Sequence, residues 1–436
     1  MGFKDLLIFP IMVLIVFAIF HIWQVKSGNT GKRWKVAFFF KIFSTLFIGL
    51  LYEYYYKGGD TFNFFHHSKQ IWLATLDHPI SGIKMLFNHG VFYPELSDYI
   101  VQMWWFKDES SMMVARISAF FGFFCGHSYL GISIFFALIS FLASMSIYRV
   151  FKHIKPELDL EIFIICFFIP SVGVWGSGLF KDTISFAAAC FIIYGFYFGF
   201  IRRNKIVSNV ILIIVSSYFL YIIKIYILIS LLPALLIWVF IVNLSDIKSL
   251  AIKAIMAPLF VAIAGLAGFT IISQITSENE RYALSNISNT AKITAMDIYA
   301  GWGAGSGSSY YLGAQDGSIG NFVSLMPSAI VVTLFRPWPW EINNVIMVLS
   351  ALESFFFLVF TLFVVFKTKL RNFIRSILSN PEIIFCLTFS IVLAIGVGIA
   401  SYNFGTLSRY KIPLMPFYLL ALLFIYRDYQ RIRKRA

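Results

Sequence analysis

Four short polar motifs could bring acid–base and anion-binding chemistry into this otherwise apolar chain. They are Lys57-Gly-Gly-Asp60, Trp175-Gly-Ser-Gly-Leu-Phe-Lys181-Asp182, Phe335-Arg336-Pro-Trp-Pro-Trp-Glu341 and Tyr402-Asn403-Phe-Gly-Thr-Leu-Ser-Arg409-Tyr-Lys411. A carboxylate can take a proton from a hydroxyl group, and clustered cations can hold a phosphate. The residue types therefore predict a site that handles a hydroxyl group together with a phosphorylated substrate.

Asp60 is the candidate general base. It follows two glycines, which allow a sharp turn at the end of a helix and can leave the carboxylate facing the membrane surface. At that place the carboxylate can take a proton from a sugar hydroxyl. The alternative is a helix-terminal turn that carries a solvated aspartate.

Cationic side chains in the other motifs are candidate ligands for a phosphate or pyrophosphate. Arginine offers a planar fork and lysine a point charge. Asn403, Thr406 and Ser408 lie beside the best of these candidates, Arg409. The substrate-binding candidates are Lys181, Asp182, Arg336, Glu341, Glu353, Asn403, Arg409 and Lys411. The alternative for each cation is snorkelling to the membrane surface or pairing with Asp182, Glu341 or the intramembrane Glu353.

The composition requires a bilayer as solvent for most of the chain. Hydrophobic residues make up 59% of the 436 residues and charged residues 13%, and the mean hydropathy is +0.80. An ordinary soluble domain is far less apolar. The net charge of +14 does not indicate nucleic acid binding, because no water-exposed basic module is long enough.

Long apolar runs predict an all-α, polytopic bundle in a single integral membrane domain, 1–436. A spanning helix needs roughly 20 mainly apolar residues, which gives about eleven spans here. The predicted spans are 6–25, 35–56, 128–148, 159–175, 183–201, 206–223, 225–243, 250–273, 343–366, 383–400 and 412–426.

Basic residues predict the orientation of the bundle. Alternate loops and the tail from Arg427 are rich in lysine and arginine, so the positive-inside rule makes them cytoplasmic. This orientation places the N-terminus outside and the C-terminus inside. The apolar stretch 322–335 would break this alternation if it crossed, so we expect a re-entrant or surface-lying segment on the outer face.

Two long loops then face outward, 57–127 and 274–342. The first contains an apolar helical stretch, 110–124, which Asp108 can cap and which we expect to lie along the membrane interface. The second contains a glycine-rich segment, 301–309, which is either a mobile lid or a plain linker. All four polar motifs fall on the outer side in this topology.

Neither a metal nor an organic cofactor is predicted. His66 and His67 invite a metal interpretation, but adjacent histidines diverge on a helix and no third strong ligand has useful spacing. A divalent metal remains an unsupported alternative. The four cysteines lie singly in or beside apolar segments, which favours packing roles.

The arrangement resembles the C-type glycosyltransferase superfamily (GT-C). Lys57-Gly-Gly-Asp60 followed by an interface-lying helix is similar to the first outward loop of these multi-span enzymes. The other motifs resemble bacterial envelope-polysaccharide membrane proteins, including O-antigen polymerase-like ones. The resemblance implies a polyprenyl-linked sugar donor, a glycan or lipid acceptor, a GT-C-like fold in the inner (plasma) membrane, and Asp60 as the base. The chain departs from the family because its first outward loop, 57–127, has no Asp-x-Asp pair.

Three other functions are alternatives to single-sugar transfer. A polymerase or ligase of lipid-linked oligosaccharides would depend on Arg336 and Arg409 more than on Asp60. A transporter or flippase needs polar residues on both sides of the midplane, whereas the inner halves of the predicted spans are nearly free of charge. A non-catalytic assembly protein is the third.

Overall fold

A computed structural model of the protein describes residues 1–28, 30–246, 287–299, 308–313, 315–316 and 318–435. These residues are overwhelmingly helical, and their sole β-type pairing is an isolated bridge between Ser309 and Asn403. They confirm the all-helical fold class. The predicted span 250–273 and most of the glycine-rich segment lie outside the described residues.

Two compact units divide the chain, and each is described by itself. Unit 1 comprises Met1–Tyr194 and Ile211–Ile225, and unit 2 comprises Gly195–Val210 and Tyr226–Ala436. The division passes through the long helix α11 (Ile206–Asp246), whose backbone is non-helical at Lys224, with φ −151° and ψ 72°. This break agrees with the boundary predicted between spans 206–223 and 225–243.

Unit 1 is built around long apolar helices. They are α1 (Phe3–Ser27), α2 (Lys32–Leu50, continued by the π-helical turn Leu51–Tyr55), α7 (Tyr129–Ile154) and α10 (Lys181–Phe196, continued by the π-helical turn Tyr197–Ile201, which belongs to unit 2). Helix α7 packs against both α1 and α2.

Helix α1 shows the pattern of a lipid-facing span. Met12, Val16 and Phe20 recur every fourth residue and are buried, because side chains at that spacing share one helix face. Leu14, at 68% exposure, represents the apolar opposite face. Apolar residues on an outward face are costly in water and favourable in lipid, so this helix indicates a membrane protein.

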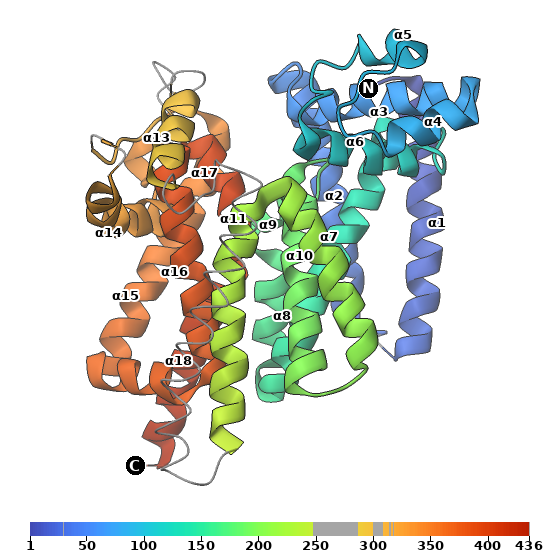
Figure 1. Ribbon diagram of the computed structural model, residues 1–436. Helices are drawn as coiled ribbons and strands as arrows, with labels where there is room; N and C mark the ends of the chain where they lie inside the picture. Colours follow the sequence, from blue (N-terminus) through green and yellow to red (C-terminus); the bar gives the residue numbers. More distant parts are fainter. Residues whose placement is uncertain (29, 247–286, 300–307, 314, 317, 436) are drawn as a thin grey trace. The chain divides into compact units, whose positions relative to one another are not determined.

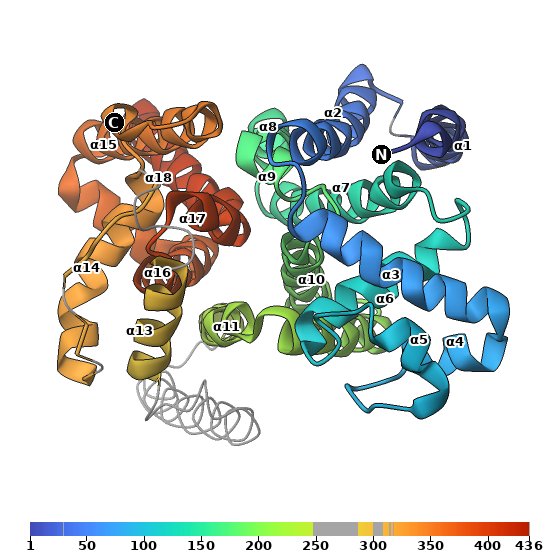
Figure 2. The same cartoon turned by 90° about the horizontal axis from the view of Figure 1, so that it is seen from above.

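Shorter helices gather at one end of these long helices, where Figure 1 shows them above α1, α2 and α7. They are α3 (Asp60–Asp77), α4 (Pro79–Leu86), α5 (Ser97–Ile100, preceded by the 3-10 turn Pro94–Leu96) and α6 (Glu109–Gly122). Helix α3 packs along α6 and against α4, as Figure 2 also shows. The helix predicted over 110–124 is therefore confirmed as α6, whereas α3 was not predicted.

The single helix predicted over 159–175 is wrong. The structure has α8 (Asp159–Phe168, preceded by the 3-10 turn Pro156–Leu158) and α9 (Pro170–Val174) in its place. Ile169 between them is extended, with φ −64° and ψ 120°. Pro170 explains the break, because proline disfavours helical backbone in the residue before it and has no N–H to donate.

Unit 2 has a similar division between long and short helices. It contains α13 (Ile287–Ile298), α14 (Ile319–Phe335), α15 (Val345–Ser379, preceded by the 3-10 turn Pro339–Glu341), α16 (Pro381–Ser401), α17 (Phe404–Tyr410) and α18 (Met415–Arg435, preceded by the 3-10 turn Ile412–Leu414). Helix α16 contacts α13, α14, α15, α17 and α18 and forms the centre of the unit.

Within the described residues, 8 helices are long and apolar enough to cross a membrane. They cover nine of the predicted spans, because α11 takes in two of them. Helix α14 has 17 residues and is shorter than these eight. The protein is therefore a multi-span membrane protein.

Candidate functional site

A strained turn places Asp60 at the start of α3. Lys57, Gly58 and Gly59 all have positive φ, at 54°, 139° and 109°. A Cβ atom on Gly59 would lie 3.0 Å from the Tyr52 ring, so this position needs glycine for its space as well as for its backbone angle. The turn therefore fixes the direction in which the chain enters α3.

Lys181 lies against the helix that this turn begins. It is the first residue of α10, and its ammonium group donates to the Ser110 hydroxyl at 2.6 Å and to Asp108 at 3.3 Å. The same ammonium lies 5.9 Å from the centre of the Phe64 ring, one helical turn after Asp60. The rings of Tyr52 and Phe180 also pack together, at 5.3 Å. Unit 1 thus brings the Lys57–Asp60 and Trp175–Asp182 motifs together.

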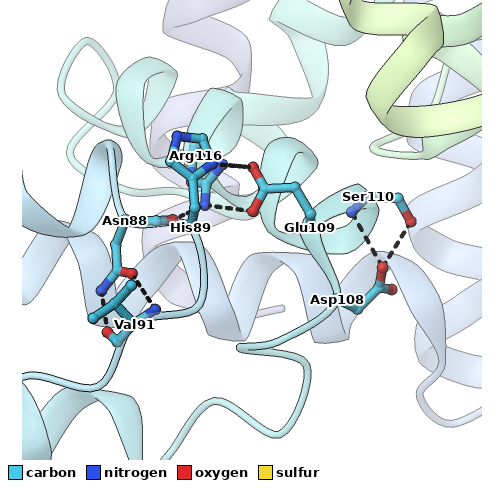
Figure 3. A network of polar contacts seen from close by, with 7 residues as sticks. All are labelled: Asn88, His89, Val91, Asp108, Glu109, Ser110 and Arg116. Atoms are coloured by element: carbon cyan, nitrogen blue, oxygen red, sulfur yellow. Dashed lines mark hydrogen bonds and ion pairs between the residues drawn. The ribbon is translucent and has the colours of Figure 1, made fainter. Parts of the chain in front are cut away.

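Asp108 connects Lys181 to α6. Its carboxylate caps that helix by accepting from the backbone N–H of Ser110 at 3.1 Å, as predicted and as Figure 3 shows. Burial by itself would raise the pKa of Asp108, but Lys181 and the Ser111 and Ser110 hydroxyls lower it below its ordinary value. The carboxylate is therefore a stable anionic partner for Lys181.

Asp182 has a different partner from Lys181, the residue before it. Its carboxylate accepts from the Lys224 ammonium, and both side chains are buried. The pair joins the start of α10 to the break in α11. We therefore assign Asp182 a role in positioning these two segments, although sequence analysis placed it among the substrate ligands.

Arg336 is held by a carboxylate in unit 2. Its Nε lies 3.0 and 3.1 Å from the two carboxylate oxygens of Glu341, which also accepts from the backbone N–H of Trp338 at 2.7 Å. The guanidinium lies 5.2 Å from the centre of the Phe404 ring and 5.9 Å from that of Tyr310. The two carboxylate oxygens of Glu341 therefore fix the direction of the Arg336 guanidinium.

Lys411 supports the backbone that carries Arg336. Its ammonium donates to the Ser354 hydroxyl at 2.8 Å and to the Arg336 carbonyl at 3.4 Å. Burial lowers the pKa of Lys411 to about 8, and Glu353 partly opposes this effect. Unit 2 therefore brings the Phe335–Glu341 and Tyr402–Lys411 motifs together.

Asn403 has a local structural role. Its side-chain oxygen accepts from the backbone N–H groups of Gly405 at 2.8 Å and Thr406 at 3.2 Å, so it caps α17. Arg409 lies half-buried in the last turn of that helix. A capping amide oxygen is occupied by the helix and is poorly placed to bind substrate as well.

A cavity of about 370 Å³ adjoins Arg336 in unit 2. Tyr311, Ser328 and Val331 also line it. The volume is within the range of small-molecule sites, which is about 300–1,000 Å³. The cavity is therefore large enough for the head group of a substrate next to Arg336.

The predicted residues thus form two groups. Unit 1 contains Asp60, Lys181 and Asp182, and unit 2 contains Arg336, Glu341, Glu353, Asn403, Arg409 and Lys411. Within unit 1, Phe64 links Lys181 to the helix that Asp60 begins. Within unit 2, Arg336 contacts both Glu341 and Lys411 directly.

Sequence analysis missed Arg116. This buried side chain on α6 binds Glu109 at 2.5 Å and also donates to the carbonyl of Asn88, while His89 lies 3.0 Å from the same Glu109 (Figure 3). The available signal was an arginine between the apolar positions Met113 and Ile117.

Sequence analysis also missed Lys41, a fully buried cation in α2. Its ammonium donates to the Ser140 hydroxyl at 2.9 Å and to the Val172 carbonyl at 3.4 Å. A lysine inside a predicted span is a signal for a functional or packing role. The half of this span that was predicted to be the inner one therefore contains a lysine side chain.

His67 does not combine with other candidate ligands. Its ring is stacked on Trp105 at 5.4 Å, and both ring nitrogens are buried without a hydrogen-bond partner in the part of the chain that the structure describes. No group of three or more histidine, cysteine or acidic side chains in that part could hold a metal.

The chain matches no protein-family model, no curated protein and no solved structure.

Proposed function

We propose that the protein is a membrane glycosyltransferase that moves a sugar from a polyprenyl-phosphate donor to a hydroxyl group of a glycan or lipid acceptor. The observation that carries this proposal is that Lys181 lies against the helix that Asp60 begins. The cation lies against Phe64 of this helix, so a candidate base and a candidate phosphate ligand occupy one end of unit 1.

The proposed reaction is a single displacement at the anomeric carbon. Asp60 accepts the proton of the acceptor hydroxyl, whose oxygen forms the new bond to that carbon. The bond from the carbon to the donor phosphate breaks, and its electron pair leaves with the phosphate. Lys181 stabilises the resulting charge. One displacement inverts the configuration of the sugar.

The proposal also includes the position of the chain in the membrane. We propose about eleven spans, an arrangement of the GT-C kind and insertion in the plasma (inner) membrane of a bacterium. The helix-rich ends that carry the polar motifs face outward, and the basic C-terminal tail is cytoplasmic. The clusters of short helices in each unit support an interface-lying role for these segments.

The test removes the carboxylate of Asp60 without changing its size. Full-length Asp60→Asn and the wild type are expressed in the host organism at equal membrane levels. Asp77→Asn is the matched control, because it removes a carboxylate at the other end of the same helix. Surface glycans and lipid-linked sugars are then measured by mass spectrometry.

We expect Asp60→Asn to abolish one glycan linkage and to increase the corresponding lipid-phosphate sugar at least tenfold. The Asp77 variant keeps both at the wild-type level. Unchanged glycans in Asp60→Asn would contradict the proposal. Loss in both variants would indicate a structural effect of α3 and would contradict a specific role for Asp60.

A polymerase or ligase acting on lipid-linked oligosaccharides is the second candidate. The observation that favours it is the cavity beside Arg336, a guanidinium that Glu341 holds in direction. In this function Arg336→Ala leaves single repeat units unpolymerised, while Asp60→Asn is silent. The same glycan profiles therefore separate the two enzymes.

A further inference from the structure

Unit 1 contains a cavity of about 630 Å³, whose lining on α10 begins at Ile184, three residues after Lys181. It is enclosed by α4, α6, α10 and the part of α11 that belongs to this unit. Most of its lining is apolar and includes Met113, Ile117, Phe191 and Phe219. An apolar lining of this kind suits a hydrocarbon ligand and does not suit ordered water.

The volume corresponds to a chain of moderate length. A cavity of about 150 Å³ holds one benzene molecule, so 630 Å³ corresponds to roughly 25 carbon atoms on the same scale. That capacity is greater than a head group requires. It fits several isoprene units of a longer chain.

Lys181 and the cavity lie along the same face of α10. Ile184, Ala188 and Phe191 line the cavity and follow Lys181 at steps of three and four residues, which places all four positions on one helix face. On α6, Ser110 binds Lys181 and precedes the lining residue Met113 by three positions. Lys181 at the start of α10 and its partner Ser110 near the start of α6 therefore lie one helical turn before residues that line the cavity.

Arg116 adds a charged side chain to the cavity wall. Arg116 lines the cavity and is 6% exposed. Its Nε–H has no acceptor among the described residues, although its other nitrogens bind Glu109 and Asn88. A buried donor without a partner is unfavourable.

The cavity can be reached from the side. Val215 and Phe120 both line it and are exposed, at 48% and 54%. Apolar side chains exposed on a membrane helix face hydrocarbon. A lipid can therefore enter without leaving the bilayer.

We propose that this cavity holds the isoprenoid chain of the donor while Lys181 binds its phosphate. The proposal rests on the proposed function for the choice of an isoprenoid ligand. It adds the position of the chain between α6, α10 and the part of α11 that belongs to unit 1. The substrate class is thus a single-chain isoprenyl phosphate.

The test uses a photoreactive isoprenyl phosphate, with a diazirine in the chain, on the purified full-length protein in vesicles. Val215→Trp fills the mouth of the cavity. Ile214→Trp is the matched control, because it is the next residue on the same helix, is 63% exposed and does not line the cavity. Labelled peptides are identified by mass spectrometry.

We expect labels on α6 and α10 in the wild type and in Ile214→Trp, and at least tenfold less labelling in Val215→Trp. Unlabelled isoprenyl phosphate competes with the probe, whereas the matching isoprenol and phosphatidylglycerol do not. Equal labelling of both tryptophan variants, labels confined to helices that do not line the cavity, or competition by phosphatidylglycerol overturns the proposal.

The two proposals fail in different ways. If the probe labels α6 and α10 but Asp60→Asn leaves every glycan unchanged, the cavity binds the chain and the transferase function is wrong. If Val215→Trp transfers sugar with the wild-type KM for the donor, the function stands and the chain lies elsewhere.

Discussion

The ammonium group of Lys411 lies 3.4 Å from the main-chain carbonyl of Arg336, a residue 75 positions earlier in the chain. The same ammonium donates to the Ser354 hydroxyl at 2.8 Å, and this hydroxyl donates to the Arg336 carbonyl at 2.9 Å. Three segments of unit 2 therefore meet at the backbone of Arg336, whose guanidinium is bound by Glu341. This contact makes Lys411 a positioning residue for Arg336.

Lys411 should make stability depend on alkaline pH. Burial lowers its pKa from 10.5 to about 8, so the unfolded state binds the proton more strongly between these two values. The free energy of unfolding then rises as pH increases from 8 to 10.5. We expect Lys411→Met to lose this rise, as measured by chemical unfolding in detergent at several pH values. An equal rise in both proteins contradicts the prediction.

Arg336→Lys should impair donor binding although it keeps the charge. Lysine cannot reproduce the two-oxygen contact with Glu341, so the cation loses its fixed direction. For the polymerase or ligase function, we expect the KM for the lipid-linked oligosaccharide to rise about tenfold, equivalent to about 1.4 kcal/mol, with little change in kcat. Steady-state kinetics of the purified protein measure this split. A fall in kcat alone contradicts it.

The ion pair between Asp182 and Lys224 should be strongly coupled. Removing one member leaves a buried charge, so Asp182→Asn and Lys224→Gln should each lower the free energy of unfolding by about 3–5 kcal/mol. The double variant should lose less than the sum of the two. Unfolding in detergent measures all three.

Lys84 and Glu95 form the matched control pair. Their charged groups are 2.8 Å apart, but their side chains are 47% and 50% exposed. Solvent screening makes the coupling of such an exposed pair much weaker than that of a buried pair. Equal coupling in the two pairs contradicts the structural role that we assign to Asp182.

His127 should make the protein sensitive to acid. Burial, together with the nearby Lys4, lowers its pKa from 6.5 to about 4, and its Nε2 lies 3.0 Å from the Ser68 hydroxyl. As pH falls from 6.5 to 4, the unfolded state takes up the proton first, so stability decreases by up to about 3 kcal/mol. His127→Gln should flatten this decrease in thermal unfolding. His78→Gln is the control, because this exposed histidine ends α3.

The local pattern of the sequence was sufficient for the helical class and for most of the long apolar helices. Apolar length predicts a membrane helix because the backbone must satisfy its own hydrogen bonds in lipid, and this holds for spans such as α1 and α7. The Asp108 cap of α6 was also predictable, since a cap is made by neighbouring residues. The break at Pro170 was within reach of the sequence as well, because proline acts on the preceding residue.

Only the tertiary structure decided which charged groups pair. Sequence analysis considered Asp182 as a partner for the candidate cations, but Asp182 is paired with Lys224 and Lys181 binds Asp108. It identified Lys411 as a phosphate ligand, whereas the structure shows it supporting the backbone of Arg336. Lys41 and Arg116 gave weak signals, because their partners lie on distant segments or across a turn. Such pairings depend on how helices pack in three dimensions, and hydrophobic spacing along the chain carries no information about them.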